Sequence, residues 1–376
     1  MTYTYLSKKI AGTVFHKLQR ADSPRTGIFE VGVCQRGFNI NSESAYIGRH
    51  PIQLIFGQTP EEMAAAFKTD RNARLSAGNS IAMSPWANRM IGPVVNHNGA
   101  QCVEVSFQGQ SRFVPTNLGD YRLHGLIYAS DYEGVRINEL PSGGIALTGT
   151  AFVSGEQWFS DLLYTHTIAL ENVRGEDAMT RSVNVTNTGN APAPVSVGEH
   201  PYFQIPGYQF RSQIVMRIPG TSTILLGEDA NPDFSVNPVA PAEDSPLSDI
   251  FARGGKLGEL HLNNSFLNLQ PTTLESGIIR AGVVFGSGGY GIFVSTPQDN
   301  SVNVLHGFAP IGTDHPADGK AVAIEFQGNL LSPLDPRWEE FSPLKSIPGM
   351  HPSGMRILAP GDSMNWQVTH TVVELQ

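Results

Sequence analysis

Two segments of the chain place a titratable side chain beside small residues on one face of a predicted strand. In residues 321–327 (AVAIEFQ), branched and aromatic residues alternate with two alanines and Glu325, so Glu325 should point away from the core. In residues 195–200 (VSVGEH), His200 shares its face with a serine and a glycine. If the two meet in one cavity, a proton-accepting carboxylate and a proton-donating imidazole predict acid–base catalysis. Taken singly, a solvated glutamate and a structural histidine are the alternatives.

Two further residues are candidates for contact with a ligand. Arg89, in SPWANRM, carries a guanidinium in an apolar setting and needs a partner, either a ligand hydroxyl or the carboxylate of Glu325. His124 is followed by Gly125, which lets the backbone approach a ligand closely. A histidine in a turn is the alternative, and His306 has a similar His-Gly context.

Aromatic residues and a second carboxylate accompany these candidates. The rings of Trp86, Trp158, Tyr202 and Phe203 are suited either to stacking on a flat ligand ring or to packing in the core. Glu199 precedes His200, but the alternation places it on the face of the neighbouring valines. We therefore predict a structural role for Glu199.

The segments that must position these residues have the pattern of antiparallel strands. Hydrophobic and polar residues alternate with a period of two, as in strands that are buried on one face. Turn signals such as Asn98-Gly99 separate the segments. The clearest predicted strands are Cys102–Phe107, Val183–Thr188, 195–197, 292–294, 322–326 and Asn365–Leu375.

Helical periodicity is scarce. Pro60–Phe67 is the best candidate for a surface helix, with Thr59 as its N-cap and two glutamates in its first turn. Residues 228–248 and 331–354 are rich in proline and are predicted to be irregular. The sequence therefore predicts an all-β chain that forms a single domain over residues 1–376.

The composition limits the classes of partner and the cellular compartments that we expect for this protein. The 376 residues carry a formal net charge of −9 without a Lys/Arg cluster, which argues against nucleic acid and anionic membranes as partners. The sequence lacks an apolar run of 18 residues and a secretory signal, so we expect a cytoplasmic protein. Cys34 and Cys102 could form a single disulfide bridge, but we expect two free thiols in a reducing compartment. A monomer and a homodimer both remain open.

Several other chemistries lack their motifs. The sequence contains no GxxxxGK[ST], HExxH or GxSxG motif. Its 11 histidines never show HxH or HxxxH spacing, which leaves a metal centre without local support. We therefore expect neither a metal nor an organic cofactor.

In their order along the chain, these fragments resemble the motifs of the aldose 1-epimerase (galactose mutarotase-like) family. SPWANRM, LHG and EHPYF are similar to the family's Asn-Arg-Ile/Met, His-Gly and His-x-Tyr-Phe motifs. AIEFQGN is similar to the late strand that bears the family's catalytic glutamate. RILAPGDSMNWQVTHTV is similar to the closing segment, so the resemblance covers roughly residues 25–375.

This resemblance implies a fold, an activity and a set of site residues. The fold would be a β-supersandwich of large twisted antiparallel sheets with few short helices, which holds a monosaccharide on a concave sheet face. His200 would be the general acid and Glu325 the general base in the interconversion of α and β anomers of a free aldohexose. The residues expected to bind the substrate are Arg89, His124, Asn88, Asn263, Tyr202 and Trp86.

One departure from the family pattern concerns the substrate. The family has a substrate-binding aspartate between its catalytic histidine and glutamate, whereas LHLNNSFLNL offers Asn263 and Asn264. An amide donates and accepts hydrogen bonds but carries no charge. A non-catalytic carbohydrate-binding protein and another carbohydrate-active enzyme, such as a sugar-phosphate epimerase or a lyase, are therefore alternatives. A phosphate substrate would require further cations, for which Arg112 and Arg122 are candidates.

Overall fold

Two large antiparallel sheets pack face to face in the structure, a computed structural model that describes residues 2–21, 26–69, 78–207, 209–241, 254–272, 276–299 and 301–375. The first sheet has 12 strands, with β5 (His50–Gln53) pairing to β4 beside the main order. That order is β1 (Tyr3–Ile10), β2 (Thr13–Arg20), β3 (Gly27–Cys34), β4 (Asn39–Ile47), β6 (Ser80–Met83), β17 (Gly198–Gln204), β26 (Ala321–Gln327), β25 (Val304–Ala309), β22 (Leu262–Leu269), β19 (Gly220–Ile224) and β20 (Val239–Pro241).

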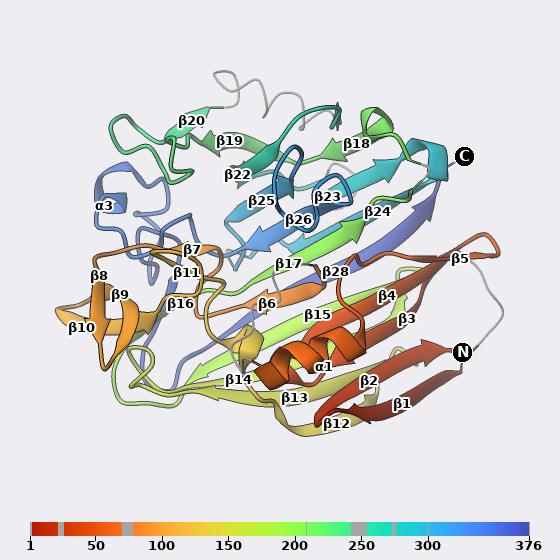
Figure 1. Ribbon diagram of the computed structural model, residues 1–376, viewed down its shortest axis with the longest axis horizontal. Coiled ribbons are helices and arrows are strands. Elements are labelled where there is room, and N and C mark those ends of the chain that lie inside the picture. Colours follow the sequence, from red (N-terminus) through yellow and green to blue (C-terminus); the bar gives the residue numbers. More distant parts are fainter. Residues whose placement is uncertain are drawn as a thin grey trace.

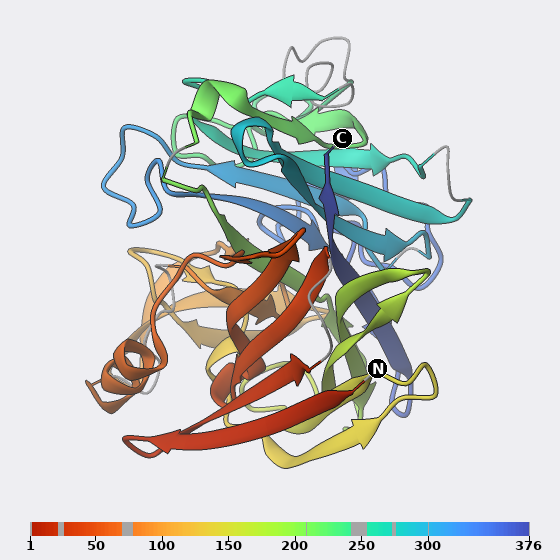
Figure 2. The same ribbon diagram turned by 90° about the vertical axis from the view of Figure 1, so that its right-hand side faces the viewer.

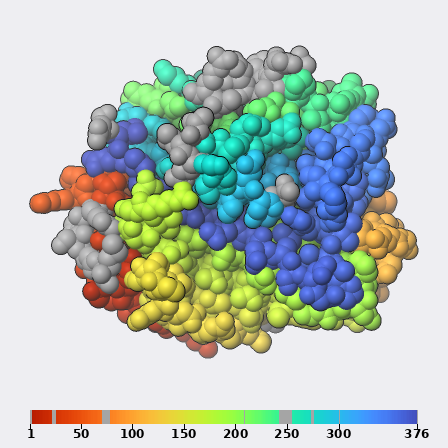
Figure 3. All heavy atoms as spheres, turned by 180° about the vertical axis from the view of Figure 1, so that it is seen from behind, coloured from red at the N-terminus to blue at the C-terminus, as the bar shows by residue number. Residues whose placement is uncertain are grey.

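The second sheet has nine strands and lies behind the first in Figure 1, where it forms much of the face seen in Figure 3. It carries the long strands of the chain, including the closing one. Its order is β12 (Glu133–Glu139), β13 (Ile145–Val153), β14 (Leu162–Val173), β15 (Glu176–Asn187), β28 (Ser363–Glu374), β24 (Tyr290–Pro297), β23 (Ile278–Phe285), β18 (Ile214–Arg217) and β21 (Gly255–Lys256).

Smaller elements decorate one edge and one face of this sandwich. The strand pair β7 (Arg89–Met90) and β11 (Arg122–Leu123) lies beside the first sheet, and a three-stranded sheet projects next to it (Figure 1). The remaining strands are β8 (Val94–His97), β9 (Ala100–Phe107), β10 (Gln110–Pro115), β16 (Ala193–Val195) and β27 (Arg356–Leu358).

The described α-helices are α1 (Pro60–Thr69) and α3 (Trp338–Phe341). Thr59 and Glu62 form a capping box at the start of α1, because each side chain bonds the backbone N–H of the other. The apolar face of α1 packs on the first sheet, and the helix lies in front of this sheet in Figure 1 and to its left in Figure 2. Among the described residues, none of the helices is both long and apolar enough to cross a bilayer.

The core lies between the two sheets, where alternate residues of each strand meet. Leu18, Val33, Ile324 and Phe326 of the first sheet belong to the same buried cluster as Ile168 of the second. Their outward neighbours on β26, Ala321 and Ala323, are also fully buried. The outer face of the first sheet is therefore covered at this point.

The structure confirms the predicted all-β sandwich and most of its predicted elements. The strand predicted at Cys102–Phe107 lies in β9, and the closing strand predicted at Asn365–Leu375 corresponds to β28. The predicted helix is α1, which extends to Thr69. Residues 331–354 are irregular apart from α3. Residues 228–241 of the other predicted loop are irregular apart from the short strand β20, and residues 242–248 lie outside the described residues.

Candidate active site

The strand β17 turns His200 toward the outer face of the first sheet. Glu199 and Phe203 point to the opposite side, where Phe203 belongs to the core between the sheets. The imidazole of His200 stacks on the ring of Tyr202, with centroids 4.3 Å apart and planes 20° from parallel. The ring of His124 meets it edge-on at 5.3 Å. Two aromatic contacts therefore fix the orientation of the predicted acid.

Glu325 lies on the adjacent strand, β26, and faces His200 directly. Its Oε1 is 3.2 Å from Nε2 of His200, and both side chains are nearly inaccessible to solvent. The second oxygen, Oε2, accepts a hydrogen bond of 2.8 Å from the side-chain amide of Gln327. The amide of Gln327 thus contacts the carboxylate, whereas Arg89 donates elsewhere, to the backbone oxygen of Asp229 and to Asn231 at 3.4 Å each.

Burial displaces the pKa values of this pair in opposite directions. It raises the pKa of Glu325 well above its ordinary value of 4.5, and the hydrogen bond from Gln327 offsets part of the rise. It lowers the pKa of His200 well below 6.5, and the neighbouring His124, His306 and His315 lower it further. The environment therefore favours a neutral carboxyl group beside a neutral imidazole.

The β7–β11 pair brings two more predicted residues to the cavity through unusual backbone conformations. Asn88 and His124 both have positive φ, at 59° and 63°. The backbone N–H of His124 bonds the carbonyl of Asn88 at 2.9 Å, and the Asn88 side chain accepts from the N–H of Arg89. The next residue, Gly125, must lack a Cβ, because that atom would come within 2.2 Å of the Ser84 carbonyl oxygen.

Asn263 reaches the same cavity from β22 and is held by a histidine. Its Oδ1 is 3.1 Å from Nε2 of His306, whose Nδ1 is 2.9 Å from the hydroxyl of Ser265. Because burial, with Arg89 nearby, lowers the pKa of His306 to about 3, the ring is neutral. The amide oxygen therefore accepts from Nε2–H, and the Asn263 NH₂ group is left to donate. Asn264 does not line the cavity.

These residues line one cavity of about 370 Å³, within the range of small-molecule sites. It contains seven of the eight predicted site residues, namely His200, Glu325, Arg89, His124, Asn88, Asn263 and Tyr202. Trp86 does not line it, because this side chain is fully buried and packs against Trp158 at 5.0 Å. The structure therefore places Trp86 in the core, the alternative that we considered for it.

The cavity also contains residues that the sequence analysis did not select. His306 lies opposite Glu325 in the register of β25 and β26, and its His-Gly context was the available signal. His315 and Phe308 pack against the Tyr202 ring. The remaining side chains are Leu118, Tyr121, Leu123, Glu228, Asp229 and Ala230. Most of them lie on loops whose approach to the sheet has no periodic sequence signal.

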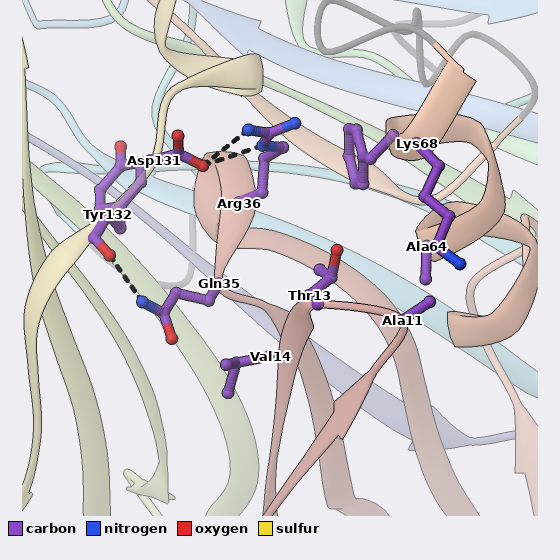
Figure 4. Close-up of a pocket in the computed structure, with 11 residues that line it drawn as sticks. Ala11, Thr13, Val14, Gln35, Arg36, Ala64, Lys68, Asp131 and Tyr132 are labelled. Carbon is purple, nitrogen blue, oxygen red and sulfur yellow. Dashed lines mark hydrogen bonds and ion pairs between the residues drawn. The ribbon is translucent and has the colours of Figure 1, made fainter.

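A separate cavity of about 270 Å³ lies between the β1–β2 turn and α1 (Figure 4). Two of its polar side chains are already paired, since Arg36 contacts Asp131 and the Gln35 amide donates to the backbone of Tyr132. In the described ranges, no group of three or more His, Cys, Asp or Glu side chains is arranged to hold a metal ion. The cavity around His200 and Glu325 is therefore the candidate active site.

Comparison with known proteins gives matches at the level of structure. No family model and no curated protein matches the chain. A galactose mutarotase-like protein from Clostridium acetobutylicum superposes with a TM-score of 0.75 and 12% identity, over 99% of each chain. The GalM/aldose epimerase homologue from C. elegans gives 0.68 and 16%, over 97% of this chain and 100% of the other.

A galactose 1-epimerase from Lactobacillus acidophilus NCFM gives a TM-score of 0.67 at 13% identity, over 100% of this chain and 99% of the other. Identities this low establish a shared architecture and leave the activity to be argued from the site. The predicted fold is thus confirmed: this chain has the galactose mutarotase-like fold.

Proposed function

We propose that the chain is an aldose 1-epimerase that interconverts the α and β anomers of a free aldohexose, with Glu325 as the base and His200 as the acid. The observation that carries the proposal is the 3.2 Å approach of the two side chains in a cavity of ligand size. The contact lies across two neighbouring strands of a rigid sheet, which suits the precise positioning that proton transfer requires.

The chemistry requires two coupled proton transfers. Ring opening moves the proton of the anomeric hydroxyl to Glu325, while His200 gives its proton to the ring oxygen. Rotation about the C1–C2 bond and the reverse transfers then close the other anomer. The pair holds one transferable proton throughout, on His200 before ring opening and on Glu325 in the open-chain state. Burial, which favours the neutral pair, brings the open-chain state closer in energy to the ring-closed state.

Several groups are placed to hold the sugar ring. Arg89 and Asn263 offer hydrogen-bond donors to sugar oxygens, and His124 lies next to His200 on the cavity wall. Tyr202 and Phe308 give the cavity an apolar surface of the kind that packs against sugar C–H groups. Fixing the ring in this way contributes to the rate because the reacting oxygens then meet the acid and base without a search.

The cavity suits an uncharged sugar better than a phosphorylated one. Arg112 and Arg122 are engaged elsewhere, by the backbone carbonyls of Trp158 and of Gly125 respectively. Glu228 and Asp229 line the cavity and oppose a phosphate dianion. Among the described residues that line the cavity, Arg89 is the single arginine or lysine side chain.

The test is anomer exchange, followed by polarimetry or NMR on freshly dissolved α-glucose, α-galactose and other aldoses. We expect Glu325→Gln and His200→Asn each to lose about 10²–10⁴-fold in rate. The exposed pair His50→Asn and Glu340→Gln provides matched controls that keep full activity. Full activity in either cavity variant contradicts the assigned roles.

A second candidate is a carbohydrate-binding protein without catalysis, which the amide at position 263 favours because the related family carries a carboxylate there. It predicts sugar binding with anomer exchange no faster than in buffer. The presence of His200 and Glu325 does not separate the two candidates, because both functions are compatible with this pair. The rate of anomer exchange in the unmodified protein separates them.

We also propose that the protein works in the cytoplasm. Cys34 and Cys102 are both free and buried, and thiols persist in a reducing compartment. Fractionation of the native cells tests this placement, and recovery of the protein outside the cytoplasm contradicts it.

A further inference from the structure

A second, larger cavity opens on the same face of the first sheet as the candidate active site. Its volume is about 930 Å³, more than twice the 370 Å³ of the catalytic cavity. Residues of β1–β4 line one wall, and Gln53 with residues 55–61, which lead from β5 into α1, line the other. We refer to this cavity as the β1–α1 groove.

The groove and the catalytic cavity are neighbours along β17. Tyr202 lines the catalytic cavity and Gln204 lines the groove, and alternation on a strand places both side chains on one face. Two strand residues span about 6.6 Å, which is the scale of one sugar unit. Phe56 lines the groove and packs against the cluster that contains Tyr202. The rings of Tyr202 and Phe56 thus lie between the two cavities, and a ligand that extends from the cavity around His200 across them along β17 reaches the groove.

The groove is lined by groups that suit sugar hydroxyls. The side chains of Asn41, Gln58 and Gln204 bring amides to it, and an amide pairs with adjacent hydroxyls as both donor and acceptor. Oδ1 of Asn41 and Oε1 of Gln58 are buried without a hydrogen-bond partner among the described residues. Such unsatisfied acceptors are costly, so each amide gains if its side chain turns to accept a hydrogen bond from a ligand or water in the groove. Phe15 and Phe56 add aromatic surface.

The charges of the groove are balanced. Lys8 on β1 lies 3.8 Å from Glu61 at the start of α1, and Lys17 pairs with Glu30 at 3.0 Å. Lys8, Lys17 and Glu61 are the Lys, Arg, Asp and Glu side chains that line the described part of the groove, and Glu30 lies outside this lining. An uncharged ligand fits this lining better than a phosphorylated or acidic one.

We infer that the β1–α1 groove binds the non-reducing units of an uncharged oligosaccharide whose reducing-end sugar occupies the catalytic cavity. The preferred substrate of the proposed epimerase is then an oligosaccharide with a free reducing end. The inference rests on the proposed function for the reaction, whereas binding in the groove stands on the lining described above.

Chain-length dependence in the unmodified protein tests the inference. Anomer exchange and binding are measured by NMR and calorimetry for glucose, for maltose and maltotriose, and for cellobiose and cellotriose. We expect the better trisaccharide to have at least a tenfold higher kcat/KM and a tenfold lower Kd than glucose. Equal values for all chain lengths overturn the inference and leave the epimerase proposal intact.

Two variants locate the effect. Gln204→Ala should reduce the advantage of the trisaccharide at least threefold while glucose turnover is unchanged. Gln367→Ala, an exposed glutamine on β28 of the other sheet, is the matched control and should change neither. Binding of the trisaccharide that depends on Gln204, without exchange of any anomer, supports the groove and contradicts the epimerase. A trisaccharide advantage that survives Gln204→Ala and Gln58→Ala together overturns the inference.

Discussion

Glu199 and His200 are successive residues of β17 that point to opposite sides of the first sheet, and each meets the other residue type there. His200 faces Glu325 at the candidate active site, whereas Glu199 faces His370 in the core, at 2.9 Å. Both pairs are almost completely buried. Strand β17 thus contributes one residue to each of two buried Glu–His pairs, and their surroundings drive the two pairs to opposite charge states.

The core pair belongs to a network of ionised groups. Arg181 lies 2.8 Å from Glu199, and Glu43 lies 3.0 Å from the second nitrogen of His370. Burial alone would lower the pKa of His370, but the charges of Glu199 and Glu43 outweigh it and raise that pKa to about 10. Burial would raise the pKa of Glu199, but His370 and Arg181 bring it down to about 2.

The two pairs differ in the residues that surround them. Two cations and two carboxylates balance one another in the core, so every charge there has a partner. The cavity pair has an amide, Gln327, and other histidines as its neighbours, and no arginine contacts Glu325 among the described side chains. The core pair is therefore fixed in its charged form, while the cavity pair can change its protonation, as acid–base catalysis requires.

The same substitution at Glu199 and at Glu325 tests most directly whether the two pairs differ in charge state. We expect Glu199→Gln to lower the free energy of unfolding by about 3–5 kcal/mol, because Arg181 and His370 lose a buried counter-charge. We expect Glu325→Gln to change it by less than ~1 kcal/mol, because burial already favours the neutral side chain at that position. Urea denaturation of both variants measures the two values.

Activity gives the reverse order in the same two variants. Glu325→Gln removes the proposed base and should therefore lose most of the anomer exchange. Glu199→Gln retains the base, so this variant should keep measurable anomer exchange under conditions in which it is still folded. Equal destabilisation by the two substitutions would show that the two environments do not differ as described.

A smaller and continuous perturbation is pH. The folded pKa of His370, about 10, exceeds its ordinary 6.5, so its contribution to stability is complete below pH 6.5 and is lost as pH rises through 10. The folded pKa of Glu199, about 2, lies below its ordinary 4.5, so its contribution is complete above pH 4.5 and is lost toward pH 2. Stability from this network should therefore be greatest between pH 4.5 and 6.5.

Thermal unfolding at a series of pH values measures this profile. One pKa unit corresponds to ~1.4 kcal/mol, so the decline between pH 6.5 and 10 should amount to several kcal/mol. His370→Asn provides the control, because it removes the titrating group and should flatten the alkaline part of the profile. An unchanged slope in that variant would assign the decline to other groups.

The sequence predicted the faces of β17 and β26 because alternation is a local property. It separated Glu199 from His200 and predicted a structural role for the former, which agrees with its place in the core network. Alternation did not predict what covers the small residues. Ala323 lies opposite both Tyr202 and Phe308 in the strand register, and the rings of these residues occupy the space that the alanines leave.

Contacts between distant segments had no comparable local signal. Besides His200, the carboxylate of Glu325 contacts the amide of Gln327, two residues along its own strand. Arg89 was considered for this position because a guanidinium is the usual partner of a buried carboxylate. His370 and Arg181 come from β28 and β15 of the other sheet, and only the packing of the two sheets brings them to Glu199. The core network was therefore not accessible from the sequence alone.

The smallest expected effect sharpens the comparison at the cavity itself. The amide of Gln327 donates to Glu325 and stabilises its charged form, so it is a positioning residue whose loss should raise the pKa of Glu325 further. In Gln327→Leu, the alkaline limb of the pH–rate profile for anomer exchange should move to higher pH. A hydrogen bond to a charged group contributes about 1.5–3 kcal/mol, which corresponds to a shift of about 1–2 pH units. The acid limb, which reports His200, should stay in place, because Gln327 contacts the other carboxylate oxygen.

Gln327→Glu would add a second carboxyl group beside Glu325, and like charges should raise the same pKa again, so both variants should move the same limb in the same direction. Movement of the acid limb instead would mean that the pair titrates in the order of the core network, with His200 charged and Glu325 ionised.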